Sequence, residues 1–146
     1  MPDALIEAEA AADRGEVPVG AVIVDPSGQI IAKAGNRTRA DNDPTAHAEI
    51  LAIRIACAAI QSERLIGCSL WVTLEPCPMC AAAIGFARLE SLHFGASDPK
   101  SGGVDHGPQV FKSTSAHHTP DIYRGASEHQ CAVLLRDFFR QKRTVS

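Results

Sequence analysis

The chain has 146 residues, 45% of them hydrophobic, and a formal net charge of −3. This length and composition predict a single globular domain over residues 1–146, and the lack of any apolar run of about 18 residues predicts no membrane span. The small net charge neither requires nor excludes a nucleic-acid partner, because local patches of charge decide such binding.

The beginning of the chain is predicted to form a helix and a hairpin. Residues 3–14 carry a modest apolar stripe typical of an amphipathic helix, and Gly15 ends it. The β-branched run at 19–24 predicts a buried strand. After a turn at 25–28, residues 29–34 predict a second strand that runs antiparallel to the first.

A polar loop over 35–44 follows the hairpin and contains Asn36. This loop is either a solvated connection or a segment in which Asn36 reads the edge of a base, and the local sequence leaves both interpretations open. Asp43, followed by a proline, predicts the N-cap of a helix over 44–60. This helix is nearly all apolar after Glu49, so we expect it to be buried.

Two short stretches carry the residue types of a catalytic metal site. His47 and Glu49 are expected in the first turns of the helix that Asp43 caps. Cys77 and Cys80 are three residues apart, which places them on one face at the start of a further helix. Both pairs therefore lie near helix N-termini, where the positive end of the helix dipole favours thiolate over thiol.

One imidazole and two thiolates leave the fourth position of a tetrahedral zinc ion open, as in catalytic rather than structural zinc sites. Zinc lowers the pKa of water at that position to about 7, and Glu49 would then act as the proton shuttle. Two alternatives remain. Cys77 and Cys80 could form a redox pair, and His47 could be a helix cap or a core residue.

The second half of the chain predicts further strands and helices. Strands are expected over 69–74 and 89–94, separated by a helix over 78–88, and Ile122 and Tyr123 predict a short last strand. The resulting ββαβαβ order implies that part of the sheet is parallel.

Two regions near the end of the chain leave alternatives open. Within 95–121, His117 and His118 belong to a surface loop, contact a substrate, or bind a second metal. A final helix over 128–143 has a basic end, which either stabilises its C-terminus or contacts RNA phosphates.

Three cysteines lie outside the metal motif, in apolar surroundings. They are expected to be buried free thiols, which fits a cytoplasmic location. They are Cys57, Cys68 and Cys131.

The pattern of His47, Glu49, Pro76, Cys77 and Cys80 matches the H-x-E and P-C-x-x-C signature of the zinc nucleobase deaminases. Over nearly its whole length, the chain further resembles the bacterial tRNA-specific adenosine deaminases. The matching segments are 16–22, 35–37, 43–50, 74–77 and 135–140.

This resemblance implies a three-layer α/β/α sandwich with a mixed five-stranded sheet, as in cytidine deaminases, and a homodimer with one zinc ion per subunit. It implies hydrolytic conversion of adenosine to inosine at the wobble position of a tRNA anticodon stem-loop. His47, Cys77 and Cys80 would bind zinc, and Glu49 would be the catalytic acid and base.

The resemblance also suggests two groups of contact residues. Those expected to bind the base or line its pocket are Asn36, Val17, Pro18, Val19, Glu75 and Pro76. Those expected to contact RNA are Asp98, Lys100, His117, His118, Phe138, Phe139, Arg140 and Arg143.

One segment departs from the family pattern. Many members carry Asn-His-Arg before the last strand, where this chain has His117-His118-Thr119. The metal chemistry is unaffected, but the RNA contacts of this loop are in doubt. Two competing functions share the metal residues: a deaminase of free nucleobases or nucleosides, and a non-catalytic zinc module that binds RNA or protein.

Overall fold

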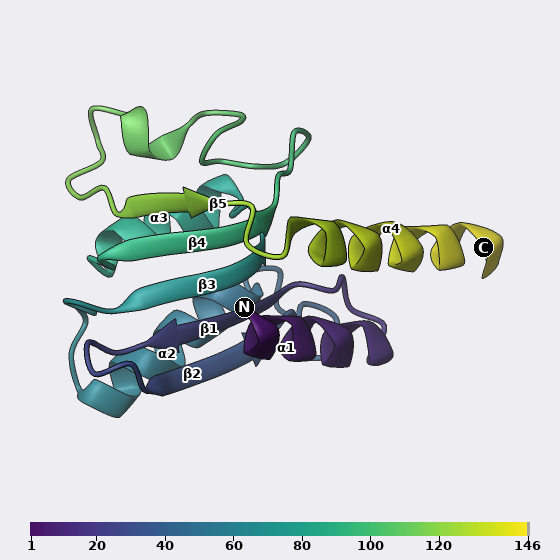
Figure 1. Ribbon diagram of the computed structural model, residues 1–146, viewed down its shortest axis with the longest axis horizontal. Helices are drawn as coiled ribbons and strands as arrows, with labels where there is room; N and C mark the ends of the chain where they lie inside the picture. The colour runs from purple at the N-terminus through teal and green to yellow at the C-terminus, as the bar shows by residue number, and fades with distance from the viewer. Residues whose placement is uncertain (146) are drawn as a thin grey trace.

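The computed structural model describes residues 1–145 and is built on a five-stranded sheet with the strand order β2-β1-β3-β4-β5 (Figure 1). The pairs β2–β1 and β1–β3 are antiparallel, whereas β3–β4 and β4–β5 are parallel. The sheet is therefore mixed, as predicted. The strands are β1 (Gly20–Val24), β2 (Ile30–Gly35), β3 (Ser69–Leu74), β4 (Ser91–Ala96) and β5 (Asp121–Arg124).

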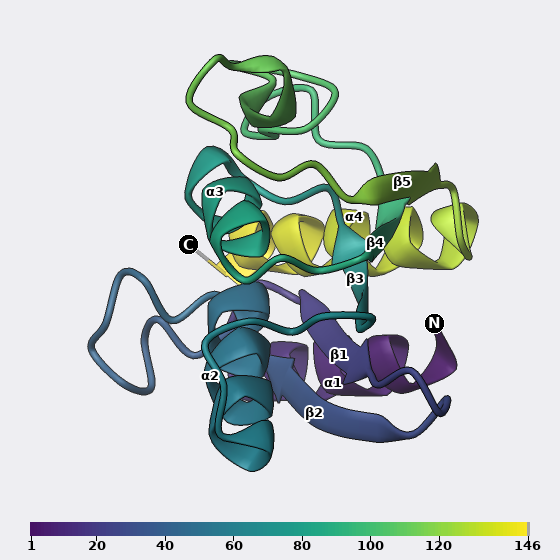
Figure 2. The same ribbon diagram turned by 90° about the vertical axis from the view of Figure 1, so that its left-hand side faces the viewer.

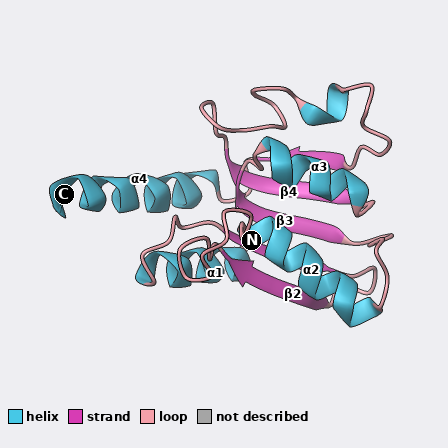
Figure 3. Ribbon diagram, turned by 180° about the vertical axis from the view of Figure 1, so that it is seen from behind, coloured by secondary structure: helices cyan, strands magenta, loops and turns pink. Residues whose placement is uncertain are grey.

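Helices cover both faces of the sheet. The helices α2 (Ala48–Ile60) and α3 (Pro78–Phe86) lie side by side on one face (Figure 3). The helices α1 (Pro2–Asp13) and α4 (Glu128–Val145) pack on the other face, and α4 extends beyond the sheet (Figure 1). This arrangement confirms the predicted α/β/α sandwich.

Successive side chains of β3 point to opposite faces of the sheet, so β3 contributes to the packing on both sides. Leu70 and Val72 are fully buried in the main hydrophobic cluster, which also contains residues of α2 and α3. Trp71 points to the opposite face and stacks on His93 of β4, with ring centroids 3.8 Å apart. His93 in turn stacks on Tyr123 of β5 at 4.7 Å, so a row of rings ties the parallel strands together.

Small residues let the helices approach the sheet closely. The buried side chains of α1 are all alanines, and a Cβ atom added at Gly20 of β1 would collide with the carbonyl oxygen of Ala4. Three of the four buried residues of α2 are also alanines, and the fourth is Glu49. A carboxylate inside an otherwise apolar helix face needs a functional explanation.

The start of α2 corrects the sequence prediction. The helix begins at Ala48 rather than at Pro44, with His47 as N-cap. Asp43 instead closes a turn, accepting hydrogen bonds from the backbone N–H and the hydroxyl of Thr45 at 2.9 and 2.7 Å. The helix is also not buried all round, because Ile55 on its outer face remains 46% exposed.

The segment between β4 and β5 forms an extended excursion above α3 (Figure 2). Its only regular element among the described residues is the 3-10 helix η1 (Val110–Lys112). Nowhere in residues 1–145 is there a helix with the length and apolar character needed to cross a membrane.

Candidate metal centre and active site

Two of the three predicted metal ligands occupy N-cap positions. His47 caps α2 and Cys77 caps α3, both with extended backbone and without a side-chain hydrogen bond to their own helix. The side chains are therefore free to turn toward each other across the two helix starts. Cys80 follows in the first turn of α3, after Pro78 has set the helix direction.

The ligand atoms converge. The Nδ1 atom of His47 lies 3.6 Å from the Sγ atom of Cys77 and 3.5 Å from that of Cys80. In a tetrahedral zinc site, the standard bond lengths place nitrogen and sulfur ligand atoms about 3.6 Å apart. The donor set and its spacing therefore fit zinc. Within residues 1–145 this is the one cluster suited to a metal, and it includes neither His117 nor His118.

The electrostatics of the pair of thiols favour a thiolate. A hydrogen bond from Cys80 is the main reason that the pKa of Cys77 falls to about 4, and His47 adds to the effect. The same contact, together with burial, raises the pKa of Cys80. The hydrogen bond with Cys77 also raises the pKa of His47. The cluster of His47, Cys77 and Cys80 thus favours a negatively charged sulfur atom, which suits the binding of a cation.

Glu49 lies beside the ligands but outside their cluster. It is 4% exposed and sits in the first turn of α2. Burial is the main cause that raises its pKa to about 7, and the neighbouring Cys77 contributes. A carboxyl group with a pKa near neutrality can both accept and return a proton, as general acid–base catalysis requires.

Asn36 has a structural task in addition to its predicted one. Its side-chain oxygen accepts a hydrogen bond of 2.8 Å from the backbone N–H of Ala48. Asn36 thereby caps the start of α2, because His47 directs its side chain elsewhere. This hydrogen bond fixes the orientation of the amide, and the side-chain NH₂ group is the donor that Asn36 can offer to a ligand.

Glu75 organises the loop that follows β4. Its carboxylate is fully buried and accepts backbone hydrogen bonds from Asp98, Val104, Asp105 and His106 at 3.0–3.2 Å. A fifth contact, 2.8 Å long, comes from the His106 ring. With its oxygens occupied in this way, the Glu75 side chain supports the loop rather than facing an open pocket.

The same loop is pressed against the metal-binding stretch. A Cβ atom at Gly103 would lie 2.6 Å from the backbone nitrogen of Pro78, and the Gly103 N–H donates to the carbonyl oxygen of Pro76. Asp105 forms a bidentate ion pair with Arg124 of β5: Nε and Nη2 of Arg124 donate to Oδ2 and Oδ1 of Asp105 at 2.6 and 2.7 Å. The loop therefore links the ligand stretch to the last strand.

The predicted pocket-lining segment before β1 is largely internal. Pro18 and Val19 are buried, and the carbonyl oxygen of Val19 accepts the backbone N–H of Asn36. Next to them, the carboxylate of Glu16 is buried as well and holds the loop before α2, accepting hydrogen bonds from Arg39 and Ala40.

The residues predicted to contact RNA differ in their exposure and in their contacts within the protein. The His118 ring lies 2.6 Å from the Leu89 carbonyl oxygen and anchors its loop, whereas His117 is exposed. Asp98 closes a turn by accepting the Ser101 N–H. Exposed side chains include Lys100, Phe139, Arg140 and Arg143, while Phe138 is 9% exposed beneath Lys142.

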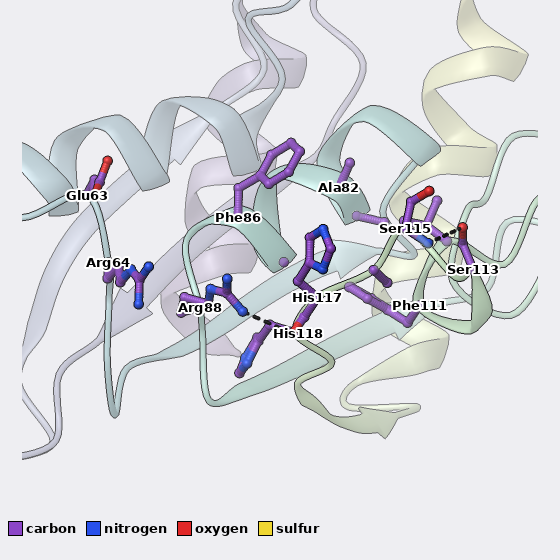
Figure 4. Close-up of a pocket in the computed structure, with 14 residues that line it drawn as sticks. Glu63, Arg64, Ala82, Phe86, Arg88, Phe111, Ser113, Ser115, His117 and His118 are labelled. Atoms are coloured by element: carbon purple, nitrogen blue, oxygen red, sulfur yellow. Dashed lines mark hydrogen bonds between the residues drawn. The ribbon is translucent and has the colours of Figure 1, made fainter.

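A separate hollow of about 380 Å³ lies on the outer side of α3 and contains none of the metal ligands. Figure 4 shows Phe86, Phe111 and His117 around it. Phe86 is 76% exposed. Apart from its cysteine, α3 consists only of apolar residues and glycine, so its outer face offers apolar surface to a partner.

Sequence reasoning missed three residues that shape the site: Glu16, His106 and Arg124. Each acts on a segment far away in the chain, which no local pattern reveals. The only local signal was the Gly102–Gly103 pair, since adjacent glycines often mark a close backbone approach.

The fold and the metal cluster together define a zinc-deaminase type of site. The family model for MafB19-like deaminases matches residues 1–143, and the chain belongs to this family. Among curated relatives, the tRNA-specific adenosine deaminase of Agrobacterium fabrum is 56% identical over 98% of this chain and 93% of its own length. The tRNA-specific adenosine deaminase of Bacillus subtilis is 43% identical over 98% of this chain and 88% of its own length.

Solved structures agree with this placement. A structure from a study of A-to-I editing by tRNA:A34 deaminases at the wobble position of transfer RNA has a TM-score of 0.91 and 55% identity, covering 92% of this chain and 97% of that chain. The guanine deaminase of Bacillus subtilis has a TM-score of 0.65 and 32% identity, covering 97% and 90%. The predicted cytidine deaminase-like fold is confirmed.

Proposed function

We propose that this protein is a zinc-dependent deaminase that converts adenosine to inosine at the wobble position of a tRNA anticodon. The observation that carries the chemistry is a buried carboxylate, Glu49, beside three converging ligand atoms that leave a fourth position open. The substrate is suggested by relatives at up to 56% identity that are named tRNA-specific adenosine deaminases.

The proposed reaction adds water to carbon 6 of the adenine ring and releases ammonia. His47, Cys77 and Cys80 would hold zinc, which when bound lowers the pKa of water toward neutrality and so provides a nucleophile. Glu49 accepts a proton from the attacking water. It passes this proton to the ring nitrogen. It then takes the second proton from the hydroxyl group that has added to carbon 6 and passes it to the departing amine, so that water and adenosine yield inosine and ammonia.

Asn36 would bind the purine base in this reaction. Its oxygen is committed to the Ala48 N–H, so its NH₂ group would donate to an acceptor on the base, such as a ring nitrogen. An unpaired anticodon loop suits this pocket, because a base that is not paired costs little to swing out.

We further propose that the protein forms a homodimer through the outer face of α3. This face combines the strongly exposed Phe86 with a mainly apolar hollow. The charged residues that line the hollow are Glu63, Arg64 and Arg88, which lie outside α3, and α3 itself carries no charge. Phe86→Glu should therefore shift the protein to a monomer in sedimentation velocity. Ile6→Glu, at an apolar side chain 62% exposed on α1, should not. A monomeric wild type would overturn the proposal.

Inosine formation tests the proposed function. The zinc-loaded protein is incubated with an anticodon stem-loop carrying adenosine at the wobble position, beside free adenosine, cytosine and guanine. We expect turnover on the stem-loop, and loss of several orders of magnitude in Glu49→Ala with zinc retained. Turnover on free guanine alone would instead support the activity named for the Bacillus subtilis guanine deaminase.

A further inference from the structure

A second depression, of about 340 Å³, follows the outer edge of β2 between α1 and α2. We call it the β2-edge groove. Its charged lining is basic except for one acid and comprises Arg14, Lys33, Arg37, Arg54 and Glu7. Because β2 is the last strand in the order of the sheet, no further strand of residues 1–145 covers this side.

The cations of the groove are only partly neutralised. Lys33 and Arg37 each contact one exposed carboxylate, at 3.4 and 3.0 Å. Arg14 instead donates from Nη2 to the carbonyl oxygen of Asn36, although the charge of Arg14 also acts on the carboxylate of Glu16. Arg54 forms no ion pair within residues 1–145, although its charge also acts on the carboxylate of Asp43. Guanidinium groups with N–H donors to spare favour anions that have several oxygens.

The groove opens beside the proposed active site. Arg14 contacts the backbone of Asn36, whose side chain caps the helix that carries Glu49. A polynucleotide with one base at Asn36 would bring the phosphates of neighbouring nucleotides to this side of the molecule. Arginine and lysine contacts to phosphates position a nucleic acid without reading its sequence.

The helix α1 lies close against the end of β2 that faces the groove. Gly35 at the end of β2 is buried, and a Cβ atom there would lie 2.7 Å from the carbonyl oxygen of Glu7 and 3.2 Å from Nη2 of Arg14. The helix α1 thus packs directly on the face of the sheet at this end of β2, and the guanidinium group of Arg14 lies beside it.

We propose that the β2-edge groove binds phosphates of the RNA strand next to the deaminated nucleotide. This inference rests on the proposed function for its choice of RNA, but its own test needs no catalysis. An acidic peptide is the other polyanion that the groove could attract, and it serves as an arm of the experiment.

The test uses two matched pairs of variants of the full-length, zinc-loaded protein. Glu7→Gln and Glu9→Gln make the same change in charge on α1, but Glu7 lines the groove and Glu9 does not. Arg54→Gln is paired with Lys112→Gln, an exposed cation on η1 outside the groove. Fluorescence anisotropy measures Kd for an anticodon stem-loop with guanosine in place of the wobble adenosine, over a range of salt concentrations, beside a poly-glutamate peptide.

We expect Arg54→Gln to weaken RNA binding roughly fivefold and to reduce the slope of log K against log salt by about 0.7. Glu7→Gln should tighten binding, while Glu9→Gln and Lys112→Gln should leave it within twofold of wild type. Unchanged binding in both groove variants would overturn the proposal even if the stem-loop is deaminated, and so would peptide binding in place of RNA binding. If the groove variants change RNA binding as expected but the stem-loop is not deaminated, the groove proposal stands and the proposed function is wrong.

Discussion

The metal-ligand cluster and the loop between β4 and β5 lie against each other, yet they are ordered in opposite ways. His47, Cys77 and Cys80 come from short motifs at two helix starts, and each motif is positioned by its own helix. The loop has little regular structure and takes its shape from one buried carboxylate, Glu75, 23 to 31 residues away in the chain. Local geometry orders the first region, and long-range contacts, most of them made by Glu75, order the second.

The largest effect is expected where a ligand is removed. Cys77→Ala leaves two of the three converging ligand atoms, so the purified protein should lose zinc and all measurable deamination. Elemental analysis provides the measurement. Cys57→Ala, at a free and half-buried thiol on α2, should retain its metal. Full zinc occupancy in Cys77→Ala would mean that the cluster is not the site.

A smaller effect is expected from the residue that orders the loop. Glu75→Gln places an NH₂ group among backbone N–H donors, and we expect a loss of about 2–3 kcal/mol in the free energy of unfolding. Zinc should remain bound. Hydrogen exchange should accelerate at the loop amides of Val104, Asp105 and His106. Glu90→Gln, at an exposed position before β4, should change neither quantity. Slow exchange in Glu75→Gln would show that the loop is ordered by something else.

The smallest effect concerns Glu16, which holds the loop before α2. Burial by itself would raise the pKa of Glu16, but hydrogen bonds from Ala40, Arg39 and Thr38 outweigh it, and the pKa lies below 4.5. A carboxylate with a lowered folded-state pKa stabilises the protein above its unfolded pKa, and this contribution is lost as the pH falls through the folded value.

Glu16→Gln should therefore cost about 1 kcal/mol of unfolding free energy at neutral pH. The difference from wild type should shrink as the pH falls below about 4.5. Urea unfolding at a series of pH values measures it, with Glu9→Gln as an exposed control. A difference that stays constant with pH would show that Glu16 does not act through its charge.

The sequence by itself determined the chemistry of this protein. The spacing of His47, Glu49, Cys77 and Cys80 predicted a cluster at two helix starts. Cys77 and Cys80 are three residues apart and share one face of their helix, whereas His47 and Glu49 can reach one site only close to the helix end. The order of strands and helices likewise predicted that part of the sheet is parallel, since each strand and helix carries its own hydrophobic period. The three layers were implied by the family resemblance. The proposed zinc ion and the role of Glu49 follow from those residues alone.

Tertiary structure decided what depends on partners distant in sequence. The helix α2 starts at Ala48 rather than at Pro44 because the cap comes from Asn36, which directly follows β2, and not from Asp43. The loop after β4 needed the buried charge of Glu75, and the β2-edge groove needed α1 and α2 on either side of one strand. A local pattern cannot specify such contacts, because their energy exists only once the chain has brought the two segments together.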